Sequence, residues 1–227
     1  MEAYAAFTEA FSPPRPRVRN PGEGSPRTLC GDALGQDYPA TSESLGERLE
    51  RDGHLVAAEA VDVILAACRG IAEAHREGII HRDLKPDNIF LCQAKDGSKR
   101  QPKVLDFGIS KLYDDSANKQ LTQTGAIMGT PMYMSPEQLD GRMTPDAPFD
   151  VYAMGVVLYE TLSGRSPYDA DSFFMLMQQI AQGNRRSLGE AAPWLPPQLV
   201  EIVERAMHRD RNARYGSMPE LIQALEA

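Results

Sequence analysis

Two neighbouring segments of the chain carry side chains that could do chemistry. The first is His81-Arg82-Asp83-Leu84-Lys85-Pro86-Asp87-Asn88, and the second is Asp106-Phe107-Gly108. Carboxylates can hold a divalent metal ion or accept a proton, and a lysine can neutralise an anionic group. A site that transfers a phosphoryl group needs all of these, because its barrier falls mainly through positioning and charge neutralisation.

A third segment follows these two, with the sequence Gly129-Thr130-Pro131-Met132-Tyr133-Met134-Ser135-Pro136-Glu137. In this order the segments resemble those of the protein kinase superfamily: the catalytic loop H-R-D-x-x-x-x-N, the metal-binding D-F-G, and an activation segment that ends in S-P-E in place of A-P-E. Each segment alone is usually a turn or a solvated loop. An aminoglycoside- or lipid-kinase-like protein would share the first two, but the third favours the protein kinases.

The resemblance implies a role for each polar side chain of the site. Asp83 would accept the proton of the substrate hydroxyl, and Lys85 would neutralise the γ-phosphate of ATP. Asn88 and Asp106 would hold Mg²⁺. The lysine two residues after the catalytic aspartate, together with Thr130 in the G-T-P-x-Y segment, is similar to the serine/threonine kinases. The expected acceptor is therefore a serine or threonine of a protein substrate.

Structural roles are implied for His81, Arg82, Glu137, Asp150 and Arg214. Asp150, at the start of an apolar helix, would accept backbone N–H groups of the catalytic loop. Arg214 would pair with Glu137, and such a buried pair is costly to break. Phe90 would lie under the adenine of ATP, although a core aromatic in a short strand is an equally good interpretation.

The activation segment carries candidate phosphorylation sites. Thr122 and Thr124 lie where kinases that resemble the bacterial serine/threonine enzymes are phosphorylated, and Arg82 and Lys111 would supply the cations for such a phosphate. The resemblance therefore implies a segment that becomes ordered on phosphorylation. An unmodified polar loop is an equally good interpretation.

A complete protein kinase begins with a small lobe that holds a glycine-rich loop, a strand lysine and a helix glutamate. The chain has no lysine before Lys85, and Gly22 and Gly24 are followed by Arg27 where a third glycine is needed. We therefore expect a truncated kinase domain with the large lobe only and low activity on its own. Two alternatives stay open: a pseudokinase that docks a protein partner without catalysis, and a split enzyme that receives a small lobe from another chain.

The elements that must position these residues follow from periodicity and turn signals. A short helix over Leu45–Gly53 and a long one over Ala57–Glu77 precede the catalytic loop, and the pieces Asn88–Cys92 and Lys103–Leu105 predict a β-hairpin around Asp96-Gly97. After an irregular stretch over residues 108–148, further helices are predicted at Asp150–Leu162, Ser172–Gln182, Pro197–Met207 and Met218–Leu225. The fold class is mainly α (α+β): a kinase-like large lobe over residues 42–227 with a small β-hairpin, after an irregular leader over residues 1–41.

The composition excludes several other classes of protein. The 227 residues are 42% hydrophobic and 25% charged, which is typical of a globular chain, and the net charge of −8 disfavours binding to nucleic acid. Three separated cysteines suggest neither disulfides nor a zinc site, and no apolar run predicts a membrane span, so we expect a cytoplasmic protein. Cys68 and His75, on the long helix, are interpreted as core residues without a function.

Overall fold

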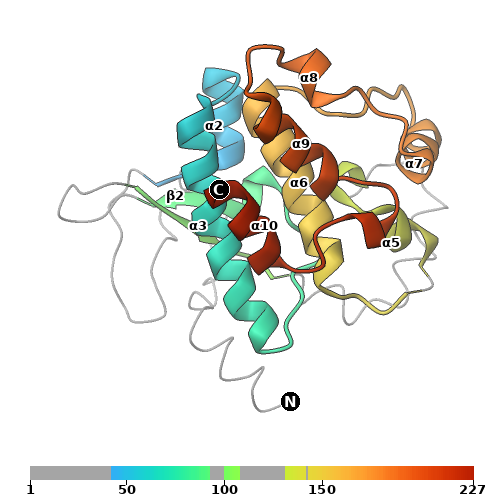
Figure 1. The fold of residues 1–227 in the computed structure, drawn as a ribbon, viewed down its shortest axis with the longest axis horizontal. Helices are drawn as coiled ribbons and strands as arrows, with labels where there is room; N and C mark the ends of the chain where they lie inside the picture. The colour runs from blue at the N-terminus through green and yellow to red at the C-terminus, as the bar shows by residue number, and fades with distance from the viewer. Residues whose placement is uncertain (1–41, 93–99, 108–130, 142) are drawn as a thin grey trace, which may run out of the picture.

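A computed structural model shows one mainly helical body with a small antiparallel sheet (Figure 1). It describes residues 42–92, 100–107, 131–141 and 143–227. The predicted fold class, mainly α with a small β element, is confirmed. The leader that we predict over residues 1–41 lies outside the described residues.

Helix α6 (Ala147–Ser163) is the central element, and nearly all of its residues are buried (Figure 1). A helix that is apolar on every side is stable only where neighbours cover each face. Its main helical neighbours are α3 (Ala57–Arg76), α9 (Pro197–Ala206) and α10 (Met218–Glu226). The helix begins three residues before the predicted Asp150, because Pro148 is tolerated in a first turn, where its missing N–H is not needed.

Gly155 lets α6 and the end of α9 approach each other closely. A Cβ atom added at this position would lie 2.8 Å from Cγ of Met207 and 2.9 Å from Cβ of Ala206. Carbon atoms in ordinary contact are about 3.5 to 4.0 Å apart. A side chain at residue 155 would therefore push the two helices apart.

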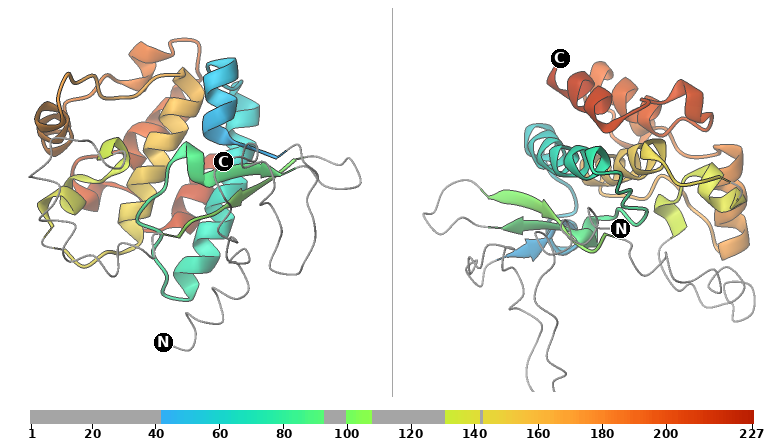
Figure 2. Two further views of the ribbon diagram at one scale, coloured as in Figure 1. Left: turned by 180° about the vertical axis from the view of Figure 1, so that it is seen from behind. Right: turned by 90° about the horizontal axis from the view of Figure 1, so that it is seen from below.

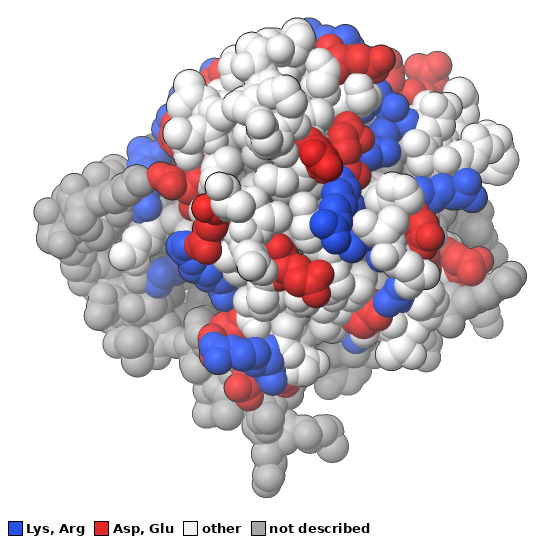
Figure 3. Space-filling view, in the orientation of Figure 1, with Lys and Arg blue, Asp and Glu red and all other residues white. Residues whose placement is uncertain are grey.

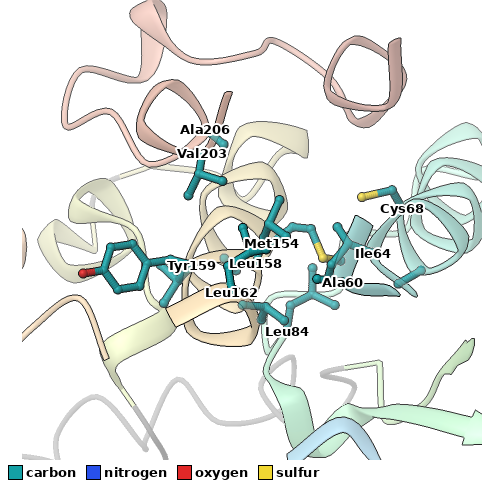
Figure 4. Close-up of a cluster of buried hydrophobic side chains, with 14 of the residues drawn as sticks. Ala60, Ile64, Cys68, Leu84, Met154, Leu158, Tyr159, Leu162, Val203 and Ala206 are labelled. Atoms are coloured by element: carbon teal, nitrogen blue, oxygen red, sulfur yellow. The ribbon is translucent and has the colours of Figure 1, made fainter. Parts of the chain in front are cut away.

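The main core lies where α3 and α6 meet, and α9 packs on another side of α6 (Figure 4). It includes Ile64 and Cys68 from α3, Met154, Leu158 and Leu162 from α6, and Val203 from α9. Burial raises the pKa of the Cys68 thiol, so this cysteine stays protonated. Cys68 is therefore a core residue, as predicted.

The sheet has the strand order β1-β2-β3, with both neighbouring pairs antiparallel. Its strands are β1 (Glu43–Ser44), β2 (Ile89–Cys92) and β3 (Gln101–Val104). The predicted hairpin of β2 and β3 is confirmed, and its register pairs Ile89 with Val104. Figure 2 shows the sheet on one side of α3 and α10 on the other. The sheet thus covers the face of α3 that the helical body leaves free.

The first strand was not predicted, since Glu43–Ser44 is too short to show a period of two and lies in a stretch expected to be irregular. Ser44 ends this strand and caps α2 (Leu45–Asp52). Its Oγ accepts a hydrogen bond from the Glu47 N–H at 3.0 Å, and the Glu47 carboxylate accepts one from the Ser44 N–H at 2.9 Å. This capping box satisfies N–H groups at the helix start and holds the strand and helix together.

Several short elements interrupt stretches expected to be irregular or loops. They are the helices α5 (Pro136–Asp140) and α8 (Leu188–Ala191) and the 3-10 turns η1 (Pro86–Asn88), η3 (Pro131–Tyr133) and η4 (Arg211–Ala213). Four or five residues make little more than one helical turn, so hydrophobic periodicity does not reveal them. The remaining helix, α7 (Phe173–Gln182), agrees with its prediction to within one residue.

The surface mixes charges of both signs. On the face shown in Figure 3, Lys and Arg side chains lie beside Asp and Glu side chains. Such neighbours include the ion pairs Arg48–Asp52 and Arg69–Glu226. Within the described ranges, no helix combines the length and the apolar character that crossing a bilayer requires.

Candidate active site

The catalytic loop is anchored to the core by Leu84. This side chain is 1% exposed and belongs to the cluster between α3 and α6 (Figure 4). Its neighbours Asp83 and Lys85 keep 34% and 25% of their side chains exposed, and the Lys85 Nζ lies 3.9 Å from an Asp83 carboxylate oxygen. Burial of one leucine therefore presents a carboxylate and an ammonium group together at the surface.

Asp150 holds the backbone at the start of this loop. Its carboxylate is fully buried, and its two oxygens accept hydrogen bonds from the N–H groups of His81 at 2.8 Å and Arg82 at 2.9 Å. Arg82 has a φ of 66°, in the left-handed region that residues with a side chain rarely adopt. The carboxylate lies in the first turn of α6, where the helix dipole favours negative charge. Asp150 thus stabilises an unfavourable bend.

His75 also contacts this carboxylate. It lies in the last turn of α3, and its Nε2 is 2.8 Å from the Asp150 oxygen that also accepts from His81. From the sequence, His75 was interpreted as a core residue without a function. No local signal could reveal the contact, because Asp150 lies 75 residues further along the chain.

His81 links the catalytic loop to the segment around Asp106. Its Nδ1 accepts a hydrogen bond from the Asp83 N–H at 3.3 Å, so Nε2 carries the proton and donates it to the Leu105 carbonyl at 3.0 Å. Its ring also lies 4.6 Å from the Phe107 ring. Burial lowers the pKa of His81 below its ordinary value, although the nearby Asp150 opposes this. The neutral imidazole can therefore accept and donate at once.

Asn88 connects the catalytic loop to the strand that leads to Asp106, the other metal-binding candidate. Its side-chain Nδ2 donates to the backbone carbonyl of Asp83 at 2.8 Å, and its backbone carbonyl accepts from the Leu105 N–H at 2.9 Å. The β2–β3 register continues through this bond, so Asp106 follows directly after the residue bonded to Asn88. Asp106 is exposed and has a φ of 56°. The backbone segments that carry residues 83, 88 and 106 thus lie side by side at one end of the hairpin.

Glu137 and Arg214 form a buried ion pair. Two guanidinium nitrogens of Arg214 lie 2.6 and 2.8 Å from the two Glu137 oxygens, and the side chains are 0% and 10% exposed. Ser135, in S-P-E, caps α5 with its Oγ and so orients Glu137 in the first turn of that helix. The pair joins α5 to the segment that follows η4.

The remaining predicted residues are placed as follows. Phe90 is half-buried in the middle strand, opposite Lys103 and Ser44. Arg82 Nε is buried and has no hydrogen-bond partner among the described residues. Four predicted residues of the activation segment lie outside the described residues: Lys111, Thr122, Thr124 and Thr130.

Comparison with protein families gives one match that covers most of the chain. The family model of the protein kinase domain matches residues 35–225. The match includes every described residue discussed above for the site, from His75 to Arg214.

Individual relatives are named as serine/threonine-protein kinases. The chain is 37% identical over 177 residues to pkn2 of Myxococcus xanthus, covering 77% of this chain and 21% of that protein. It is 39% identical over 189 residues to drp72 of Corynebacterium efficiens, covering 82% and 33%. It is 35% identical over 178 residues to PknB of Mycobacterium tuberculosis, covering 78% and 27%. The chain therefore spans about a fifth to a third of the length of these relatives.

Proposed function

This chain belongs to the protein kinase domain family, and from that premise we propose that it is a large lobe that transfers the γ-phosphate of ATP to a serine or threonine of a protein. The names of its relatives support this reaction. The observation that carries the proposal is a pair of hydrogen bonds made by the Leu105 backbone. Its N–H donates to the backbone carbonyl of Asn88, and its carbonyl accepts from His81 Nε2. They place Asp106 beside the loop that bears Asp83.

The donor groups of this site fit Mg²⁺ with ATP. Magnesium prefers oxygen ligands and is usually held by one or two protein groups together with phosphates and water. The Asn88 amide nitrogen is used by the Asp83 carbonyl, so the amide oxygen is the atom available as a ligand. Asp106 adds an exposed carboxylate next to Leu105. When bound, Mg²⁺ would neutralise charge on the phosphates.

Asp83 is proposed to accept the proton of the substrate hydroxyl. Both polar groups of its backbone are hydrogen-bonded, because the N–H donates to His81 Nδ1 and the carbonyl accepts from Asn88 Nδ2. Its carboxylate stays partly exposed, so a hydroxyl can approach it. Lys85, whose Nζ is 3.9 Å from that carboxylate, is proposed to neutralise the γ-phosphate.

The activation segment is proposed to carry regulatory phosphate on Thr122 and Thr124. The support within the described residues is the buried Arg82 Nε, which has no hydrogen-bond partner there and could donate to a phosphate. Phosphopeptide mapping of active protein should find phosphate on one of these threonines. Finding only unmodified Thr122, Thr124 and Thr130 would contradict this part of the proposal.

Intact-mass measurement after incubation with Mg-ATP and a protein substrate tests the main proposal. The parent chain should add phosphate to itself or the substrate at the low rate expected of a large lobe alone, and Asp83→Asn should lower that rate by about 10²- to 10⁴-fold, the contribution of a positioned base. Asp83→Asn should keep the parent's melting temperature, because this side chain is partly exposed. No phosphate transfer and no thermal shift with Mg-ATP would favour a docking module that binds a protein partner without catalysis.

A further inference from the structure

We infer that Lys103, in strand β3, is a further binding residue for the phosphate chain of the nucleotide. The inference rests on the proposed function and deepens it, because it concerns how the same site holds ATP. It starts from the sheet, which α3 covers on one face (Figure 2). Lys103 lies on the other face.

Strand pairing puts Lys103 on the same face as Phe90. The two residues are directly opposite each other in the β2–β3 register, and opposed residues of an antiparallel pair point their side chains to one face. The neighbours of Phe90, which are Ile89 and Leu91, are buried in the core, and Val104 packs against that core. Since side chains alternate along a strand, Phe90 and Lys103 point away from the core, and both are half-buried.

The end of this hairpin leads to the proposed metal site. Leu105 extends the strand pairing, because its N–H donates to the Asn88 carbonyl, and Asp106 comes next. At about 3.3 Å per residue, the backbone of Lys103 is at most about 10 Å from that of Asp106. A lysine carries its ammonium group on a flexible four-carbon stem about 6 Å long. The ammonium group of Lys103 can therefore reach the space between Phe90 and Asp106.

The proposed function brings the phosphate chain into that space. When Mg-ATP is held at Asn88 and Asp106 by its terminal phosphates, its base extends away from them, and a purine base stacks on an aromatic ring such as that of Phe90. The phosphate next to the ribose then lies between the base and the metal. A hydrogen bond from an ammonium group to a phosphate is charge-assisted and stronger than a neutral one.

The charges of the site also favour this role. Asp83, Asp87 and Asp106 are acidic residues of the site, and the phosphates of ATP add further negative charge. The part of the chain that the structure describes contains two lysines, Lys85 and Lys103. Lys85 is proposed to serve the γ-phosphate from the catalytic loop. Lys103 is thus the lysine that can serve the opposite end of the phosphate chain from the sheet.

Calorimetric titration of the full chain with Mg-ATP, Mg-ADP and adenosine tests the inference. Lys103→Met should weaken the binding of Mg-ATP and Mg-ADP by about tenfold, the effect of losing one hydrogen bond to a charged group. Adenosine has no phosphate, so it should bind the parent and this variant equally. Lys103→Arg keeps the positive charge and should retain most of the affinity. The control is Gln101→Met, an exposed position of the same strand that is further from Asp106, and it should change none of the three affinities.

The outcomes separate this inference from the proposed function. Equal melting temperatures of the parent and Lys103→Met would show that a lost affinity does not come from unfolding. Equal Mg-ATP affinities of these two chains, or an equal loss of affinity for adenosine, would overturn the inference and leave the proposed function standing. If Lys103→Met weakens Mg-ATP binding but the parent transfers no phosphate, the inference holds and the proposed reaction fails. A parent chain that does not bind Mg-ATP would refute both.

Discussion

Replacing Glu137 by glutamine should destabilise the fold strongly. The guanidinium of Arg214 is fully buried, and Glu137 neutralises it through two hydrogen bonds of 2.6 and 2.8 Å. Glutamine keeps the shape of the side chain but removes its charge, so it leaves a buried cation without a counter-ion. The change is made on the glutamate side because Arg214 also donates to the carbonyls of His208 and Arg209, which an arginine variant would leave unsatisfied.

The expected size follows from the burial of the pair. Removing one partner of a buried ion pair costs about 3 to 5 kcal/mol, a large part of the 5 to 15 kcal/mol that stabilises a typical domain. In a chain of this size, about 1 kcal/mol corresponds to a shift of roughly 2 to 4 °C in Tm. Glu137→Gln should therefore lower Tm by roughly 6 to 20 °C.

A second Arg–Glu pair, with a single contact of similar length, provides an exposed control. Arg69 and Glu226 lie 2.7 Å apart, but their side chains are 60% and 47% exposed. An exposed pair contributes about 0 to 1 kcal/mol, because water screens the charges. Thermal and urea unfolding of the parent, Glu137→Gln and Glu226→Gln would measure both effects. Equal destabilisation by the two variants would refute the argument that burial sets the cost.

Three further changes test the packing and the titration of the site. Leu84→Ala should lower the free energy of unfolding by about 2 to 5 kcal/mol in urea titrations, since it empties a buried site under the catalytic loop. Gly155→Ala should lower the free energy of unfolding by about 1 to 3 kcal/mol, because its methyl group would meet Met207. The control Gly70→Ala, on an open face of α3, should raise it by up to about 1 kcal/mol. A larger loss of stability in Gly70→Ala than in Gly155→Ala would contradict the close approach of the helices. The lowered pKa of His81 means that the unfolded chain binds its proton first, so stability should fall as the pH drops below the ordinary value of 6.5. His81→Phe should flatten that fall by up to about 1.4 kcal/mol per pH unit, and identical pH profiles would show that His81 is not the titrating group.

The longer elements could be predicted from the sequence because each has its own periodic signal. Helices α3, α7, α9 and α10 begin within one residue of their predicted starts, and the β2–β3 hairpin forms where two β-like pieces flank a turn signal. The short elements could not, since α5, α8 and β1 have too few residues for a pattern. Neighbouring segments stabilise them instead, as the capping box that joins Ser44 to Glu47 does for β1 and α2.

The chemical groups of the candidate site and their order along the chain can be read directly from the sequence. The three ordered segments were enough to show a resemblance to the protein kinases, which implies the reaction class, and the family match supports that resemblance. How these groups are held in place depends on the packing of the folded chain. His75 meets Asp150 because α3 and α6 pack side by side, and Leu105 ties Asn88 to His81 because two strands pair. Contacts between residues far apart in the chain depend on that packing, and a local pattern of residues does not predict it.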